Sequence, residues 1–158
     1  MVHGHGTEQG LYFPEAGTRI SEDTATLLSP EMIARDLLPF MARSAEPFGG
    51  AFVHYCGKHD ALFQMLCEQP WCSAIDLGNP EMYELDEILG ICAKTGTVFH
   101  SRVAPLDGER WHDYVTRVGG AVRESGARCA IRALTYPADD REAAAQMLRL
   151  FHEMTDAG

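Results

Sequence analysis

A chain of 158 residues in which 46% are apolar is long enough for one domain with a hydrophobic core, which excludes a largely disordered polypeptide. Thirteen basic and twenty-three acidic residues give a formal net charge of −10, which argues against nucleic acid or anionic membrane as a partner. The five cysteines form an odd number, no apolar run approaches the length of a membrane span, and no signal peptide is evident, so the sequence predicts a reducing, cytoplasmic setting.

The first 17 residues are rich in glycine and are predicted to form an irregular segment. His3 and His5 lie within it, and a pair of metal ligands is the alternative interpretation of these two residues. Residues 18–158 are predicted to form a single domain, without internal repeats or low-complexity stretches.

Short apolar runs alternate with helical patterns through this domain. The predicted strands cover residues 18–21, 51–56, 74–77, 97–100 and 129–134. The predicted helices cover residues 30–44, 58–68, 80–92, 111–126 and 140–154. Ser29 and Pro30 are a strong signal for the start of the first helix, which Pro39 is expected to kink or break. Alternation at this spacing indicates parallel strands joined by right-handed crossover helices.

The central predicted strand ends in His54, Tyr55 and Cys56, just before Gly57. Side chains two positions apart on a strand project from the same face, so His54 and Cys56 point the same way. The carboxyl end of a strand is where α/β proteins place their chemistry. This pair therefore predicts a metal site, although a His-x-Cys alone is a weak signal and both residues could instead belong to the core or a loop.

Polar residues also stand at the ends of the other predicted strands. Glu22 and Asp23 follow the first strand, where they are candidate catalytic residues or caps of the next turn. His100 ends a later strand and is predicted to line the pocket. Asn79, in the turn after residues 74–77, and Tyr55 are predicted to contact a bound cofactor.

Several short motifs together resemble the uroporphyrinogen decarboxylase superfamily. The motifs are Leu28-Ser29-Pro30-Glu31, Leu38-Pro39-Phe40, His54-Tyr55-Cys56-Gly57 and Gly78-Asn79-Pro80. Proteins of this superfamily are eight-stranded β/α barrels, and the chain is similar to the carboxyl-terminal part of one. The resemblance therefore implies an α/β fold, a partial TIM-type (β/α) barrel of about five parallel β/α units.

The pair of His54 and Cys56 is similar to the cobalamin-dependent methyltransferase branch of that superfamily. This likeness implies a zinc ion bound by His54, Cys56 and a distant third cysteine, for which Cys129 is the candidate. Glu22 or Asp23 would complete the resting coordination or accept a hydrogen bond from the ligating histidine. A small thiol would take the open position and receive a methyl group from a corrinoid, carried by a corrinoid protein.

Two other functions stay open at this point. One is decarboxylation of a tetrapyrrole, as in the decarboxylase of the superfamily. The other is a non-catalytic barrel fragment that binds a tetrapyrrole or a partner chain. About five strands would also leave the inner face of an incomplete barrel open, with apolar groups such as Phe52, Ile75 and Phe99 or, depending on register, their immediate neighbours on it. The chain is therefore expected to be a homo-oligomer or part of a longer chain.

Overall fold

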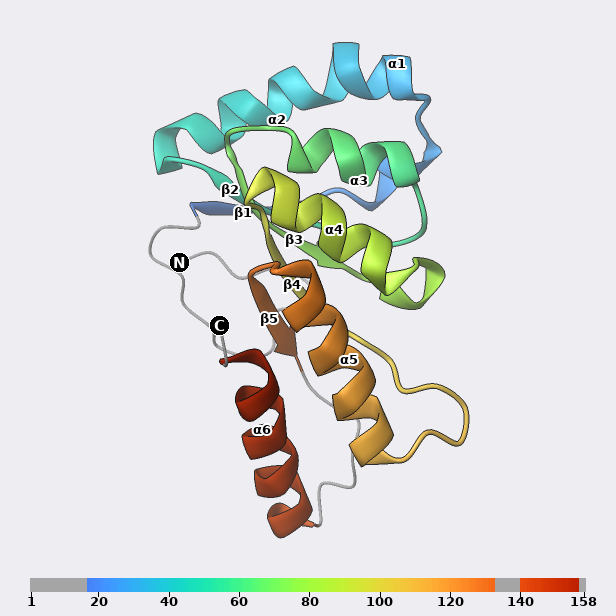
Figure 1. The fold of residues 1–158 in the computed structure, drawn as a ribbon. Helices are drawn as coiled ribbons and strands as arrows, with labels where there is room; N and C mark the ends of the chain where they lie inside the picture. Colours follow the sequence, from blue (N-terminus) through green and yellow to red (C-terminus); the bar gives the residue numbers. More distant parts are fainter. Residues whose placement is uncertain (1–16, 133–139, 157–158) are drawn as a thin grey trace.

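The computed structural model describes residues 17–132 and 140–156. Within these residues, five strands form one parallel sheet whose order follows the chain (Figure 1). The strands are β1 (Thr18–Ser21), β2 (Ala51–Tyr55), β3 (Cys72–Leu77), β4 (Val98–Arg102) and β5 (Cys129–Arg132). The predicted parallel pairing of the second and third strands is confirmed. His3, His5 and the predicted strand residues 133–134 lie outside the described residues.

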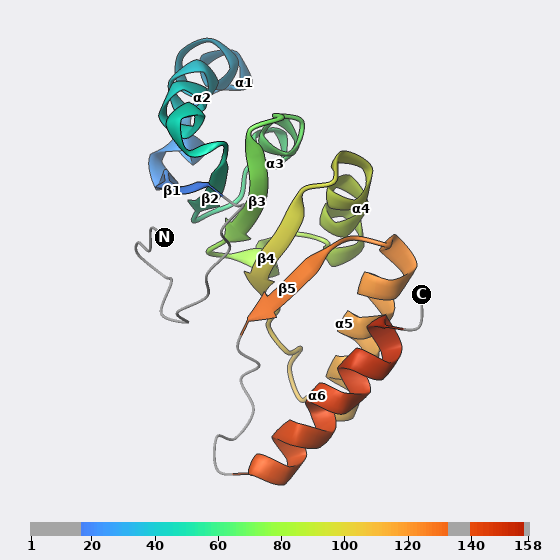
Figure 2. The same ribbon diagram turned by 90° about the vertical axis from the view of Figure 1, so that its left-hand side faces the viewer.

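Helices follow or connect these strands. They are α1 (Pro30–Met32), α2 (Leu38–Ala45), α3 (Asp60–Cys67), α4 (Leu85–Thr95), α5 (Trp111–Ser125) and α6 (Arg141–Thr155). Because the strand order never reverses, crossovers of one hand place the connecting helices on the same side of the sheet. Figure 2 shows α3, α4 and α5 along one side of the curved sheet. The predicted α/β architecture is confirmed, and the assignment to a TIM-type barrel stays a prediction.

The first helical stretch continues through Pro39 without a break, but its hydrogen-bonding pattern changes just before the proline. Ser29 caps its start, with the Met32 N–H donating to Ser29 Oγ at 3.3 Å. Pro39 has no N–H to donate to the preceding turn. A π-helical segment, Ile33–Leu37, lies directly before α2 and joins α1 to it, so the wider turn accommodates the proline.

Alternate residues of the strands form a helix face, defined as the side of the sheet that α3, α4 and α5 cover. Val53, Ile75 and Phe99 lie on it at matching register positions and are at most 1% exposed. Their partners on the helices are also buried and apolar: Leu62, Phe63, Leu66, Ile88, Leu89, Tyr114, Val115 and Val118. Burial of a side chain of this size stabilises the fold by roughly 1.5–3 kcal/mol.

The intervening residues form the inner face, defined here by Arg19, Phe52, His54, Asp76 and His100. All five are less than 10% exposed. The Arg19 guanidinium lies 5.3 Å from the centre of the Phe52 ring, and the His100 ring meets Phe52 edge-on at 5.0 Å. The inner face is thus buried and mostly polar. Of the apolar residues named for the inner face, Phe52 lies on it, whereas the register turns Ile75 and Phe99 toward the helices and places their neighbours Asp76 and His100 there instead.

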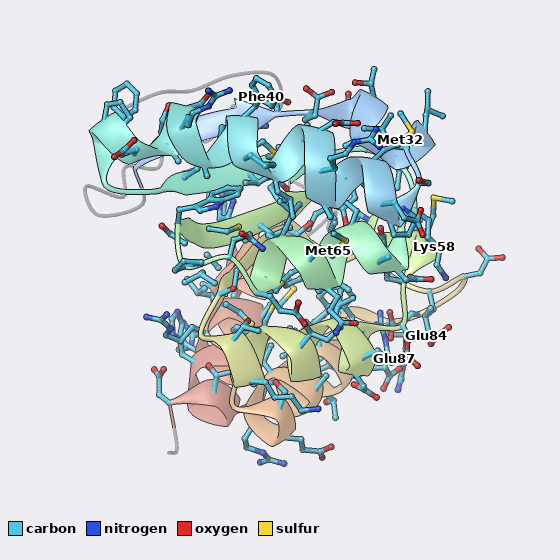
Figure 3. All side chains as sticks on the ribbon, turned by 90° about the horizontal axis from the view of Figure 1, so that it is seen from above. Met32, Phe40, Lys58, Met65, Glu84 and Glu87 are labelled. Atoms are coloured by element: carbon cyan, nitrogen blue, oxygen red, sulfur yellow. The ribbon has the colours of Figure 1, made fainter. Side chains whose placement is uncertain are left out.

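The outer surface of the helix layer mixes apolar and charged groups. Figure 3 shows Met32 and Phe40 along the first helical stretch and Glu84 and Glu87 at the start of α4. Phe40 is 57% exposed, and the Arg43 guanidinium lies 4.3 Å from the centre of its ring. None of the helices in the described part of the chain is long and apolar enough to cross a membrane.

Candidate metal centre

Three side chains of different chemistry meet beyond the carboxyl ends of β1 and β2. His54 lies in β2, Cys56 follows that strand, and Asp23 begins the 3-10 helix after β1. His54 Nε2 lies 3.6 Å from Cys56 Sγ and 3.9 Å from Asp23 Oδ1. The three ligand atoms all lie within 4.8 Å of one another, a separation that one metal ion can span.

Hydrogen bonds in the turn after β2 hold Cys56 beside Asp23. The Cys56 N–H donates to Asp23 Oδ1 at 2.8 Å. Gly57 has a φ of +94°, a conformation that favours glycine, and its N–H donates to Asn79 Oδ1 at 2.9 Å. Asn79, which the sequence predicted to contact a cofactor, is therefore placed where it fixes the turn that carries Cys56.

Gly78 gives the sulfur of Cys56 the space it occupies. A Cβ atom at position 78 would lie 2.3 Å from Cys56 Sγ and 3.1 Å from Cys56 Cα. The backbone of Gly78 is itself fixed, because its N–H donates to Tyr55 O at 2.8 Å and its carbonyl accepts from Arg102 Nη2 at 2.8 Å. The thiol therefore packs directly against the backbone at the end of β3.

The other ring nitrogen of His54 is held by Asp76 in β3. His54 Nδ1 lies 2.9 Å from Asp76 Oδ2, and both side chains are at most 5% exposed. Arg19 Nη1 lies 3.8 Å from the same carboxylate oxygen. Neither Arg19 nor Asp76 was singled out from the sequence. A single acidic residue between Ile75 and Leu77, in a strand with no other charged residue, was the signal that would have found Asp76.

The surroundings of Cys56 keep its thiol protonated at neutral pH. Burial raises the pKa of Cys56 above its ordinary value, and the charge of Asp23 and its hydrogen bond to the thiol, followed by the charge of Asp76, raise this pKa further. The positive charge of Arg102 acts in the opposite direction but more weakly. Since the thiolate is the reactive form, Cys56 is a poor nucleophile by itself. A metal ion would change this, because a coordinating thiol is deprotonated outright.

The spacing of the ligand atoms fits zinc. An ion bound tetrahedrally at about 2.0–2.1 Å from nitrogen and about 2.3 Å from sulfur holds those two atoms about 3.5 Å apart. The observed distance from His54 Nε2 to Cys56 Sγ is 3.6 Å. The distance of 3.9 Å to Asp23 Oδ1 is longer than a shared ion requires, but the Asp23 side chain is 52% exposed and has room to rotate inward.

The structure does not bring Cys129 to this group, so the predicted ligand set must be corrected. Cys129 pairs with Phe99 in register and packs among the apolar residues of the helix face. His54 lies on the inner face, on the opposite side of the sheet. Burial raises the pKa of Cys129 to about 11, as expected for a thiol that fills apolar space. The third member of the candidate ligand group is Asp23.

Two further predicted site residues lie apart from the ligand group. Tyr55 is fully buried on the helix face, where its hydroxyl lies 3.1 Å from that of Tyr83, so it faces away from the inner face. The carboxylate of Glu22 accepts a hydrogen bond from the Thr24 hydroxyl. Of the acidic pair at the end of β1, Asp23 alone belongs to the candidate ligand group.

His100 lines a pocket at the opposite end of the sheet from Cys56, whereas the sequence predicted it for a pocket at the carboxyl ends of the strands. The pocket has a volume of about 450 Å³. Residues that precede β3, β4 and β5 contribute to its wall, including Gln69, Gly96 and Arg128. His100 is 2% exposed and contacts Phe52. It is therefore part of the inner face but is not among the candidate metal ligands.

Comparison of the chain with known protein families, with curated proteins and with solved structures found no match. The resemblance to the uroporphyrinogen decarboxylase superfamily therefore stays a prediction from short motifs.

Proposed function

We propose that the chain binds a zinc ion through Asp23, His54 and Cys56 and transfers a methyl group to a small thiol. A methylated corrinoid is the proposed donor, as the resemblance to the cobalamin-dependent methyltransferases implies. The observation that carries the proposal is the convergence of a carboxylate, an imidazole and a thiol where parallel strands end.

The number and type of ligands support a catalytic ion. Structural zinc sites are closed by four protein ligands, whereas catalytic sites use three and leave one position for water or substrate. The ligand group found in the described residues has three members, one of them an exposed carboxylate. Asp23 and the rim of the site are thus accessible to a thiol from solvent.

Each of the three residues has a task in this proposal. His54 offers the lone pair of Nε2, and Cys56 offers its sulfur from the cradle that Gly78 leaves open. Asp23 lies at the exposed rim, where its carboxylate can accept the proton of an incoming thiol. A bound zinc ion would lower the pKa of a thiol that reaches it. A methylated corrinoid would supply the methyl group to the deprotonated thiol, and the electron pair of the broken bond would stay on the corrinoid.

Metal content provides the first test, with matched cysteine variants as controls. Protein purified without added zinc should contain close to one ion per chain, and Cys56→Ser should lose it. Cys129→Ser removes the same thiol group from the opposite face and should keep the ion. Asp23→Asn should weaken zinc binding, whereas Asp113→Asn, which changes an exposed acid paired with Arg110, should not.

Two outcomes would contradict the proposal. If a competition titration with a chelator detects no zinc binding, the proposed metal site is wrong, and a non-catalytic role for the chain is favoured. If Cys56→Ser and Cys129→Ser lose zinc equally, the assignment of Asp23, His54 and Cys56 as the ligands is wrong. With zinc bound, consumption of a small thiol in the presence of a methylated corrinoid tests the reaction itself.

A further inference from the structure

We infer that Arg19 and Asp76 form a positioning pair that fixes which nitrogen of His54 carries the proton. The role of this pair in metal binding rests on the proposed function, but its effect on the imidazole does not. Asp76 contacts His54 from β3, and Arg19 contacts Asp76 from β1, the strands on either side of β2. They are side chains of the inner face with no place among the three proposed ligands.

The contact with Asp76 determines the tautomer of His54. An ionised carboxylate only accepts hydrogen bonds, so His54 Nδ1, at 2.9 Å from Asp76 Oδ2, must carry the proton. A neutral imidazole has one protonated nitrogen, which leaves the lone pair on Nε2. Nε2 is the nitrogen that lies 3.6 Å from Cys56 Sγ and 3.9 Å from Asp23 Oδ1. The hydrogen bond thus directs the lone pair toward the ligand group.

Arg19 explains how an acid can lie at this position. The Asp76 side chain is 0% exposed and that of Arg19 is 2% exposed, so neither charge is compensated by bulk water. A guanidinium is always charged and only donates hydrogen bonds. Its Nη1 lies 3.8 Å from Asp76 Oδ2, the same oxygen that faces His54. Arg19 therefore favours an atom with negative charge, such as a carboxylate or amide oxygen, at the position of Asp76 Oδ2.

The shared oxygen leads to an unusual expectation for Asp76→Asn. An asparagine can present either an oxygen or an NH₂ group to His54, and each choice selects a different tautomer. Because the positive charge of Arg19 lies 3.8 Å from that oxygen, it should favour the partly negative amide oxygen over the NH₂ group in the place of Oδ2. Asp76→Asn should therefore keep the proton on Nδ1 as long as Arg19 is present. Arg19→Met/Asp76→Asn removes the positive charge and should weaken this preference.

The direct measurement is the ¹⁵N chemical shift of the two His54 ring nitrogens in metal-free protein, in buffer alkaline enough to keep the imidazole neutral. Wild type and Asp76→Asn should show the proton on Nδ1, and Arg19→Met/Asp76→Asn should show a mixture of tautomers. Arg19→Met/Asp76→Leu removes both charges and the acceptor, and apolar replacement of a buried ion pair is often tolerated by the fold. This variant should show no preference for Nδ1.

Zinc affinity provides the second readout. Loss of a partner that orients a ligating histidine typically costs about 10–100-fold in metal affinity. Arg19→Met/Asp76→Leu should fall in this range, whereas Arg110→Met/Asp113→Leu, the same change at an exposed ion pair, should not weaken zinc binding. Persistence of the Nδ1 proton in Arg19→Met/Asp76→Leu would overturn the inference. So would identical tautomers in Asp76→Asn and Arg19→Met/Asp76→Asn. If wild type binds no zinc but the tautomers change as expected, the proposed function fails and the positioning pair stands.

Discussion

The two faces of the sheet are made by alternate residues of the same strands, yet they differ completely in chemistry. Ile75 faces the helices among apolar groups, and the next residue, Asp76, faces His54 and Arg19 on the other side. Both residues are 0% exposed. Burial by itself therefore does not distinguish the helix face from the inner face, which holds the candidate site.

The two faces also differ in the kind of interaction that stabilises them. The helix face depends on the burial of apolar area, which has no direction and tolerates small shifts. The inner face depends on hydrogen bonds and charges whose partners must lie at fixed distances. Changes on the helix face are therefore expected to alter stability, whereas changes near the inner face are expected to alter the candidate site.

The largest expected effect is on the helix face. Ile75→Ala should lower the free energy of unfolding by about 2–5 kcal/mol, because it leaves a cavity between β3 and the helices. Urea denaturation measures this change. The variant that remains folded should bind zinc as wild type does, since the side chain of residue 75 points away from His54. Loss of zinc from folded Ile75→Ala would show that the two faces are not independent.

In contrast to Ile75→Ala, Gly78→Ala should change zinc affinity more than stability. The new Cβ would overlap Cys56 Sγ, so the thiol must move and zinc affinity should fall by about 100-fold, with a smaller change in stability. Gly78 is not among the glycines with positive φ, so the contact with Cys56 decides the outcome. A chelator competition titration gives the affinity. Unchanged zinc binding would mean that Cys56 does not use this space when it binds the ion.

A smaller, pH-dependent effect is expected at Glu109, which lies before α5. Two hydrogen bonds from Arg117, each 2.7 Å long, hold the pKa of Glu109 below its ordinary value of 4.5. A carboxyl with a lowered pKa in the folded state stabilises the protein above its unfolded pKa, and this contribution is lost as the pH falls through the folded value. Glu109→Gln should therefore be less stable than wild type at neutral pH.

Thermal unfolding of wild type and Glu109→Gln at a series of pH values tests this expectation. The difference in stability between the two proteins should shrink below about pH 4.5, as Glu109 becomes protonated in wild type. A difference that stays constant down to low pH would show that the charge of Glu109 does not contribute. Zinc binding at neutral pH should be the same in both proteins.

The smallest expected effect is at Gly90, which also serves as the control for Gly78. Gly90 lies within α4, and a Cβ atom there would meet no other atom within 4 Å. Gly90→Ala should raise the free energy of unfolding by about 0.5–1 kcal/mol, because alanine loses less conformational entropy in a helix. Zinc affinity should not change. Destabilisation by Gly90→Ala would mean that α4 packs more closely at this position than the structure shows.

Much of the fold could be predicted from local signals in the sequence. The strand Thr18–Ser21 and the helix start at Ser29 and Pro30 were predicted as the structure has them. The apolar periodicity also located α5 and α6. These signals are local because hydrophobic spacing and caps act within a few residues. The same reasoning placed a helix start at Pro80, where the structure has a 3-10 turn and α4 begins only at Leu85.

The candidate site could be predicted only in part, because its composition depends on register. His54 and Cys56 share a side of one strand, so the spacing along the chain was sufficient for them. Cys129 lies on a different strand, and a shift of one residue in pairing moves a side chain to the other face. The resemblance to the methyltransferases implied Cys129 as a ligand, and the sequence does not fix the register that would have tested this. Asp76 was missed for a related reason. Its partner, His54, is 22 positions away in the sequence, and only the pairing of β2 with β3 brings the two side chains together.

The order of the strands also bears on how the chain folds. Each strand pairs with the strand that follows it in the sequence, so Thr18 meets Ala51 and Phe99 meets Cys129 across connections of only a few tens of residues. Closing such loops costs little entropy, and any neighbouring pair of strands can serve as a starting point to which the next unit adds. The exposed connection at Asp107 and Gly108 lies between β4 and α5. A proteolytic cut there leaves every pairing between strands intact, so two fragments that meet at that bond retain the contacts needed to reassemble.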